Sequence, residues 1–174
     1  MQEKIAVMRR EILNAGGPEL CMRIGVHQGE CIVGNMGGDN RFDYTAIGDA
    51  VNLTSRLEGV NKFYGTDILV SETVVTAIAG QIGFRQVDVV RVKGKQLGIG
   101  IFTPCQDDGL VQLTELAFAA YRDGKWELSM EHWDRIRANF PNDPIAEIFQ
   151  DRILSFQKSG GPEHWDGIFT LETK

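Results

Sequence analysis

Hydrophobic residues follow two different patterns along the chain, and the change between them falls near residue 104. Strand-like apolar runs alternate with helical patterns in the first part, at 21–27, 30–35, 42–46, 67–71, 83–92 and 97–103. Residues 110–158 contain no strand-like run, and their apolar residues recur at helical spacing. The pattern therefore predicts an α+β domain at 1–104 and a helical extension with a tail at 105–174.

Helix starts and turns can be placed within the first part. Residues 1–14 have helical periodicity and are followed by a Gly-Gly-Pro stop at 16–18. Gln28-Gly29 predicts a tight hairpin between the first two strands. Asp49 is a candidate N-cap for a helix that runs to about Asn61, and Ser71 for a helix that runs through Ala79.

The extension contains small and aromatic residues at the spacing of a tetratricopeptide repeat. They are Gly124, Trp126, Ser129, Trp133 and Pro141. One such repeat, followed by a helix over 144–157, would make a tetratricopeptide-like module able to bind a partner protein. Because solenoids usually need about three repeats, a simple α-helical hairpin packed on the first domain is an equal alternative.

Composition restricts the classes of partner. Apolar residues make up 43% of the 174 residues, charged residues 24%, and the net charge is −6. This balance is typical of a globular chain, and its acidity argues against nucleic-acid or anionic-membrane binding. Three widely spaced cysteines and the absence of an apolar run of about 20 residues favour a reducing, cytoplasmic location without membrane contact by this chain. A cytoplasmic part of a membrane-anchored parent protein fits equally well.

Three segments carry a resemblance to a known family. The segments are RIGVHQGECIVGN (23–35), DYTAIGDAVNLTSRLE (43–58) and VKGK (92–95). Together they closely resemble the C-terminal portion of the class III adenylate and guanylate cyclase catalytic domain, over roughly residues 1–104. The resemblance implies a ferredoxin-like sheet with helices on one face, lacking its N-terminal strands. It also implies a homodimer whose active sites lie at the interface, and conversion of ATP to 3′,5′-cyclic AMP and pyrophosphate.

Two residues of the second segment suit the chemistry of cyclisation. Arg56 is permanently cationic and can hold two phosphoryl oxygens, and Asn52 lies one helical turn earlier on the same side. The resemblance gives the positions of Asn52 and Arg56 transition-state roles, at the ribose and at the phosphate. Without it, such a pair would be interpreted as a solvated helix face.

Two further positions are implied to bind substrate. Thr45 matches the position that reads the purine base, where guanylate cyclases typically have Cys and many adenylate cyclases have Asp or Thr. Lys93 matches the lysine that contacts the triphosphate. The alternatives are a strand threonine chosen for β propensity and an exposed hairpin lysine. Thr45 thus favours ATP over GTP.

The metal-binding half of the site is not found in the sequence. The family binds Mg²⁺ or Mn²⁺ through two aspartates on segments upstream of the helix that opens this chain. Asp43 and Asp49 do not occupy those positions, so no metal ligand is assigned here. We therefore expect the chain alone to be inactive and to require dimerisation with a segment that supplies the metal site. The alternative is a non-catalytic dimerisation or regulatory module, and a guanylate cyclase is a third hypothesis.

Overall fold

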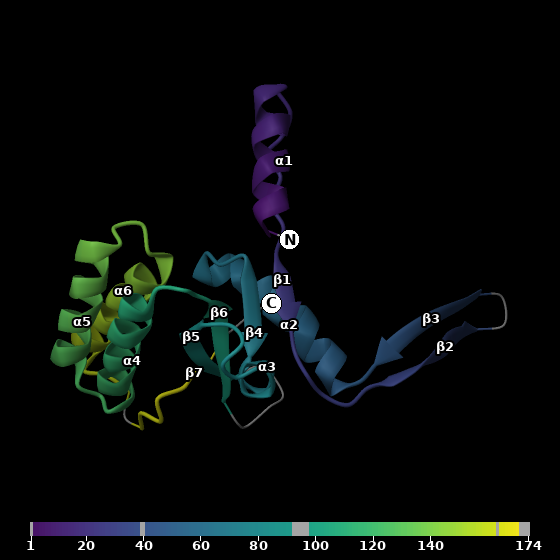
Figure 1. Ribbon diagram of the computed structural model, residues 1–174. Coiled ribbons are helices and arrows are strands. Elements are labelled where there is room, and N and C mark those ends of the chain that lie inside the picture. Colours follow the sequence, from purple (N-terminus) through teal and green to yellow (C-terminus); the bar gives the residue numbers. More distant parts are fainter. Residues whose placement is uncertain (1, 39–40, 92–97, 163, 171–174) are drawn as a thin grey trace.

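The computed structural model describes residues 2–38, 41–91, 98–162 and 164–170. It is a mixed α+β structure with a helical extension, which confirms the predicted fold class (Figure 1). In chain order the elements are α1 (Gln2–Asn14), β1 (Ile24–Val26), β2 (Ile32–Gly38), β3 (Arg41–Ile47), α2 (Asp49–Tyr64), β4 (Ile68–Ser71), α3 (Glu72–Ala77), β5 (Phe84–Arg91), β6 (Ile99–Pro104), α4 (Asp108–Arg122), α5 (Trp126–Asn139), α6 (Pro144–Ser159) and β7 (Phe169–Thr170).

Five strands form the central sheet in the order β1-β4-β6-β5-β7. β1 lies parallel to β4, and β6 runs antiparallel to both β4 and β5. The predicted pairing of the 83–92 and 97–103 strands is therefore confirmed, while their connection at Gly94 lies outside the described residues. Two residues of the tail, Phe169 and Thr170, add β7 parallel to β5, a strand that the sequence pattern did not predict.

β2 and β3 form a separate antiparallel hairpin, which we call the arm, projecting away from the sheet (Figure 1). The predicted hairpin at Gln28-Gly29 is therefore wrong, because β1 pairs with β4 and β2 pairs with β3. The reason is tertiary. Ile24–Val26 find their partners at Ile68–Val70, far along the chain, and residues 27–31 lead out to the arm.

α2 covers the β1–β4 edge of the sheet. Its buried aliphatic residues, Leu53, Leu57 and Val60, recur at helical spacing and face the sheet. A side chain at Gly25 would approach the carbonyl oxygen of Thr54 within 2.4 Å, so glycine permits the close packing of β1 on α2.

One predicted cap is wrong and the other is in its predicted place. Gly48 is the N-cap of α2 and Asp49 is its first helical residue, so Asp49 places its charge in the first turn rather than capping the helix. Ser71 is the N-cap residue of α3, but it makes no side-chain cap bond, because its Oγ shares a hydrogen bond of 2.8 Å with Nδ1 of His27. α3 then ends at Ala77, two residues before the predicted end.

The extension is a bundle of three helices. Asp107 and Asp143 cap α4 and α6 by accepting hydrogen bonds from the backbone amides of Leu110 and Ala146, both at 2.8 Å. The bundle core is aromatic, formed by Phe118, Tyr121, Trp133 and Phe149, which make edge-to-face and stacked contacts. The helix that was predicted over 144–157 is confirmed as α6.

The extension packs directly on the sheet. One continuous hydrophobic cluster includes Leu57 of α2, Val90 of β5 and Phe149 of α6. The side chain of Trp165, in the tail, donates a hydrogen bond of 2.9 Å to the carbonyl of Tyr121. The three helices of the extension therefore pack on the first domain as one unit. The tetratricopeptide-like character and the boundary at residue 104 stay predictions.

Candidate active site

The outer side of α2 carries two of the predicted site residues. Asn52 and Arg56 are exposed, whereas Leu53 and Leu57, each one position further along the helix, are buried. The helical period thus fixes the inner residues against the sheet and turns the amide and the guanidinium outward, one turn apart. Both groups can therefore approach the same ligand from α2.

Thr45 lies on the arm rather than on α2. It is exposed on β3 and pairs across the hairpin with Gly34 of β2. A Cβ built at Gly34 would meet nothing within 4 Å, so the surface beside Thr45 is open on this chain. Because directly opposed residues share one face of a hairpin, Thr45 lies on an open, exposed face of the arm.

A hollow of about 550 Å³ lies where the arm joins α2. It is lined by Glu30, Cys31, Ile32, Ile47 and Gly48. The sequence did not point to this hollow. Its walls come from the start of β2 and the end of β3, which meet at the base of the arm only when the two strands pair. Its position next to the start of α2 places it between the element of Thr45 and the element of Asn52.

The remaining predicted groups are the triphosphate-binding lysine and the metal ligands. Lys93 lies outside the described residues. Among the described residues, no cluster of three or more His, Cys, Asp or Glu side chains could hold a metal ion. We therefore assign no metal ligand to the described residues.

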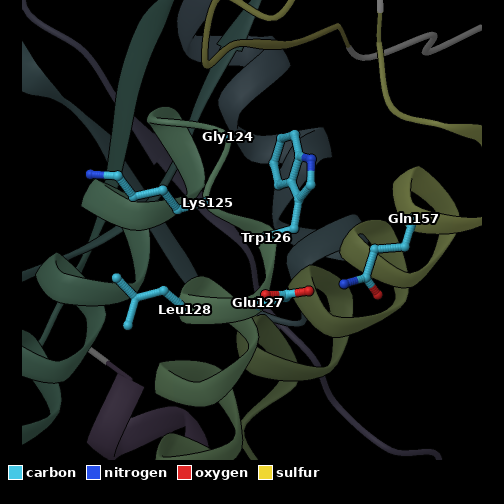
Figure 2. A pocket seen from close by; sticks show the side chains of 6 residues that line it. All are labelled: Gly124, Lys125, Trp126, Glu127, Leu128 and Gln157. Carbon is cyan, nitrogen blue, oxygen red and sulfur yellow. The ribbon is translucent and has the colours of Figure 1, made fainter.

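The extension has a hollow of its own, of about 420 Å³, at the start of α5 (Figure 2). Figure 2 shows Trp126 and Glu127 on the side that faces Gln157 of α6, with Lys125 and Leu128 on the other side. None of the predicted site residues lines this hollow.

Sequence reasoning missed a buried polar network that links the sheet to both α2 and α6. Asp88 on β5 accepts hydrogen bonds from the Tyr64 hydroxyl and from Arg152. Burial raises the pKa of the Tyr64 phenol and also that of the Asp88 carboxyl, although Arg152 and Tyr64 act against this rise at Asp88. One signal was available, because Asp88 is a lone carboxylate within the apolar run Val87–Val90.

Comparison with known proteins assigns the chain to a protein family. Residues 1–103 match the family model of the adenylate and guanylate cyclase catalytic domain. Because that match covers more than half of the 174 residues, the chain belongs to this cyclase family.

Several of the relatives are adenylate cyclases. The chain is 36% identical over 120 residues to adenylate cyclase 1 of Rhizobium meliloti, and 43% identical over 90 residues to an adenylate cyclase of Anabaena cylindrica. These matches cover 69% and 50% of the chain but only 18% of each relative. The adenylyl cyclase CyaB of P. aeruginosa has a similar fold, with a TM-score of 0.53 and 32% identity over 60% of this chain and 53% of that one.

Among the helices of the described residues, none is long and apolar enough to cross a membrane. The cytoplasmic location stays a prediction.

Proposed function

We propose that this chain supplies the nucleotide-binding half of an adenylate cyclase active site. When a second chain completes the site, it converts ATP to 3′,5′-cyclic AMP and pyrophosphate. The observation that carries the proposal is the placement of Asn52 and Arg56 side by side on the open face of α2, next to an arm that bears Thr45. Adenylate cyclases among the relatives support the choice of ATP.

Each residue has a distinct task in this scheme. The 3′-hydroxyl of ATP attacks the α-phosphorus and the bond to pyrophosphate breaks, so negative charge grows on the phosphoryl oxygens. Arg56 stabilises that charge through two parallel N–H donors, and Asn52 holds the ribose so that the hydroxyl lies in line. Thr45 reads the adenine edge through its hydroxyl, and Lys93 binds the triphosphate.

The second chain would contribute the metal-binding half. Mg²⁺ or Mn²⁺, bound by aspartates of that second chain, would supply Lewis-acid stabilisation of the phosphates. The arm supports association, because it exposes large apolar side chains away from the core: Ile32, Val33, Phe42, Tyr44 and Ile47. We therefore propose a homodimer or a complementing partner that covers the arm.

The same exposed arm also favours the alternative, a non-catalytic dimerisation module. An assay with a complementing chain separates the two. The partner is a cyclase domain that keeps its metal aspartates but has Ala at its own positions matching Asn52 and Arg56. We expect no cyclic AMP from this chain alone with ATP and Mn²⁺, and production of cyclic AMP from the mixture.

Arg56→Ala in this chain is the matched test of the mixed assay. It should lower the rate by about 10²- to 10³-fold, the usual effect of removing a transition-state donor. Cyclic AMP from the isolated chain would show that the metal half is not needed from outside. A mixture that associates but makes no cyclic AMP would instead favour the non-catalytic module.

A further inference from the structure

The buried network around Asp88 joins three elements at one carboxylate. Oδ2 of Asp88 accepts a hydrogen bond of 2.5 Å from the Tyr64 hydroxyl and one of 2.8 Å from Nη1 of Arg152. Oδ1 accepts another, of 2.7 Å, from the backbone N–H of Val89. The Asp88 and Arg152 side chains are only 1% and 6% exposed. The end of α2 and the middle of α6 are thus tied to β5 at a point without access to water.

Arg152 is an unusual choice for this position. Its guanidinium lies 3.6 Å from the centre of the Phe169 ring and 4.5 Å from that of Phe149, and its Nη2 has no hydrogen-bond partner among the described residues. Well-packed apolar residues often replace a buried ion pair at no loss of stability, so stability alone does not explain it. The planar guanidinium is nevertheless held in one orientation, because Nη1 donates to Asp88 and, at 3.4 Å, to the Tyr121 hydroxyl while the group lies over the Phe169 ring.

The geometry that it fixes is that of α2. Tyr64 is the last residue of this helix, and Asn61, one turn before it, donates a hydrogen bond of 3.0 Å to the carbonyl of Ile24 on β1. α2 is therefore held at its C-terminal end by β1 and by the Asp88–Arg152 pair. Asn52 and Arg56 lie on the same rigid helix, so its orientation sets where their side chains point.

We propose that Arg152 is a positioning residue of the cyclase site, acting through Asp88 and Tyr64 on the helix that carries Asn52 and Arg56. The helical extension is then a part of the catalytic machinery rather than a separate binding module. This inference rests on the proposed function for its effect on turnover, but its effect on α2 can be measured without any activity.

The chain offers a matched control pair. Arg85 of β5 binds both carboxylate oxygens of Asp143, and its Nε donates to Thr114 at 2.8 Å. The side chains of Arg85 and Asp143 are only 4% and 8% exposed, and the pair also joins the sheet to the extension. Its hydrogen bonds involve β5, α4 and the start of α6, but not α2.

The first experiment measures amide hydrogen exchange in the full chain with Arg152→Met and, separately, Arg85→Met. We expect Arg152→Met to speed exchange in the second half of α2 by about tenfold or more, with α5 unchanged. Arg85→Met should instead speed exchange at α4 and the start of α6, and leave α2 as it was. Equal acceleration throughout the chain in both variants, or none in α2, would overturn the proposal.

The second experiment uses the mixed cyclase assay. Arg152→Met should lower kcat by about tenfold while KM for ATP changes less than about twofold, because transition-state groups are displaced rather than lost. Arg85→Met should leave both values within about twofold. If the wild-type mixture makes no cyclic AMP, the proposed function fails, while the exchange experiment still decides whether Arg152 holds α2.

A variant that fails to fold would not block the test. Arg152→Lys keeps the charge but loses the planar fork, and Arg85→Lys is its match. Arg152→Lys should show the same selective loosening of α2 with a smaller drop in kcat. Full wild-type exchange and turnover in Arg152→Lys would show that the charge alone suffices, and would overturn the positioning role of the planar guanidinium.

Discussion

In the proposed site, Thr45 is the residue that would distinguish ATP from GTP. Its hydroxyl can donate or accept a hydrogen bond, and it borders an open surface opposite Gly34. We predict that Thr45→Cys lowers the ratio of ATP to GTP turnover in the mixed assay by about tenfold, which is the value of one hydrogen bond of about 1.4 kcal/mol.

The control for this substitution is Thr76→Cys, because Thr76 is an exposed threonine on α3, and its hydroxyl bonds only within that helix in the described structure. It should leave the ratio unchanged. An unchanged ratio in Thr45→Cys as well would refute the base-reading role, and the relatives' names would then be the remaining support for ATP.

At the residue scale, sequence found the groups with obvious chemistry and missed those that hold them. Asn52 and Arg56 could be placed on the outer side of a helix, because the period of Leu53 and Leu57 fixes which side is buried. The partner of Asp88 could not be found in the same way. Arg152 lies 64 residues further along and has no local pattern that links it to a strand carboxylate.

The arm exposes large apolar side chains to water. Phe42 and Tyr44 are 65% and 77% exposed on β3, although aromatic residues of this size usually contribute to cores or interfaces. Burying two such rings is worth about 3–6 kcal/mol. We predict that the chain self-associates and that Phe42→Thr with Tyr44→Thr weakens the association by about 10²- to 10⁴-fold, as measured by analytical ultracentrifugation.

Leu116→Gln with Leu154→Gln is the matched control. These two leucines are 52% and 44% exposed on the extension, so the change removes exposed apolar surface from a different part of the chain. Association should survive it. A wild-type chain that stays monomeric at high concentration, or one whose association is lost only in the leucine variant, would contradict a role for the arm.

The arm also shows where prediction of elements stops. The alternating pattern predicted strands at 30–35 and 42–46, and both exist as β2 and β3. The pattern did not reveal that 21–27 pairs elsewhere, since a strand's partner depends on which surfaces are buried together rather than on the nearest turn. β7 was missed for a related reason, because two residues are too few to show any period.

The whole molecule should be sensitive to alkali. Burial raises the pKa of Tyr121 to about 12, and it raises the pKa of Tyr64 as well, with the Asp88 charge adding to the effect at Tyr64. Tyrosines of the unfolded chain ionise near pH 10, while these two stay protonated in the fold. The unfolded state therefore binds fewer protons above pH 10, so stability is full below pH 10 and falls as the pH rises.

We predict that the free energy of unfolding falls from about pH 10 upward, by about 1.4 kcal/mol per pH unit for each buried tyrosine. The contribution of Tyr121 levels off near pH 12, and that of Tyr64 continues. Urea unfolding at a series of pH values measures the slope. Tyr121→Phe should make the decline between pH 10 and 12 shallower, and a slope equal to wild type would argue against a buried phenol there.

The pairing of β7 with β5 sets an order of events during translation. Arg91 and Thr170 pair as neighbours although they are 79 residues apart, and the three helices of the extension lie between them. At about 5–20 residues per second, β5 leaves the ribosome roughly 4–16 s before the strand that covers its edge. For that interval the nascent sheet has an open edge beside Val90, which gives chaperones a defined window in which to bind it.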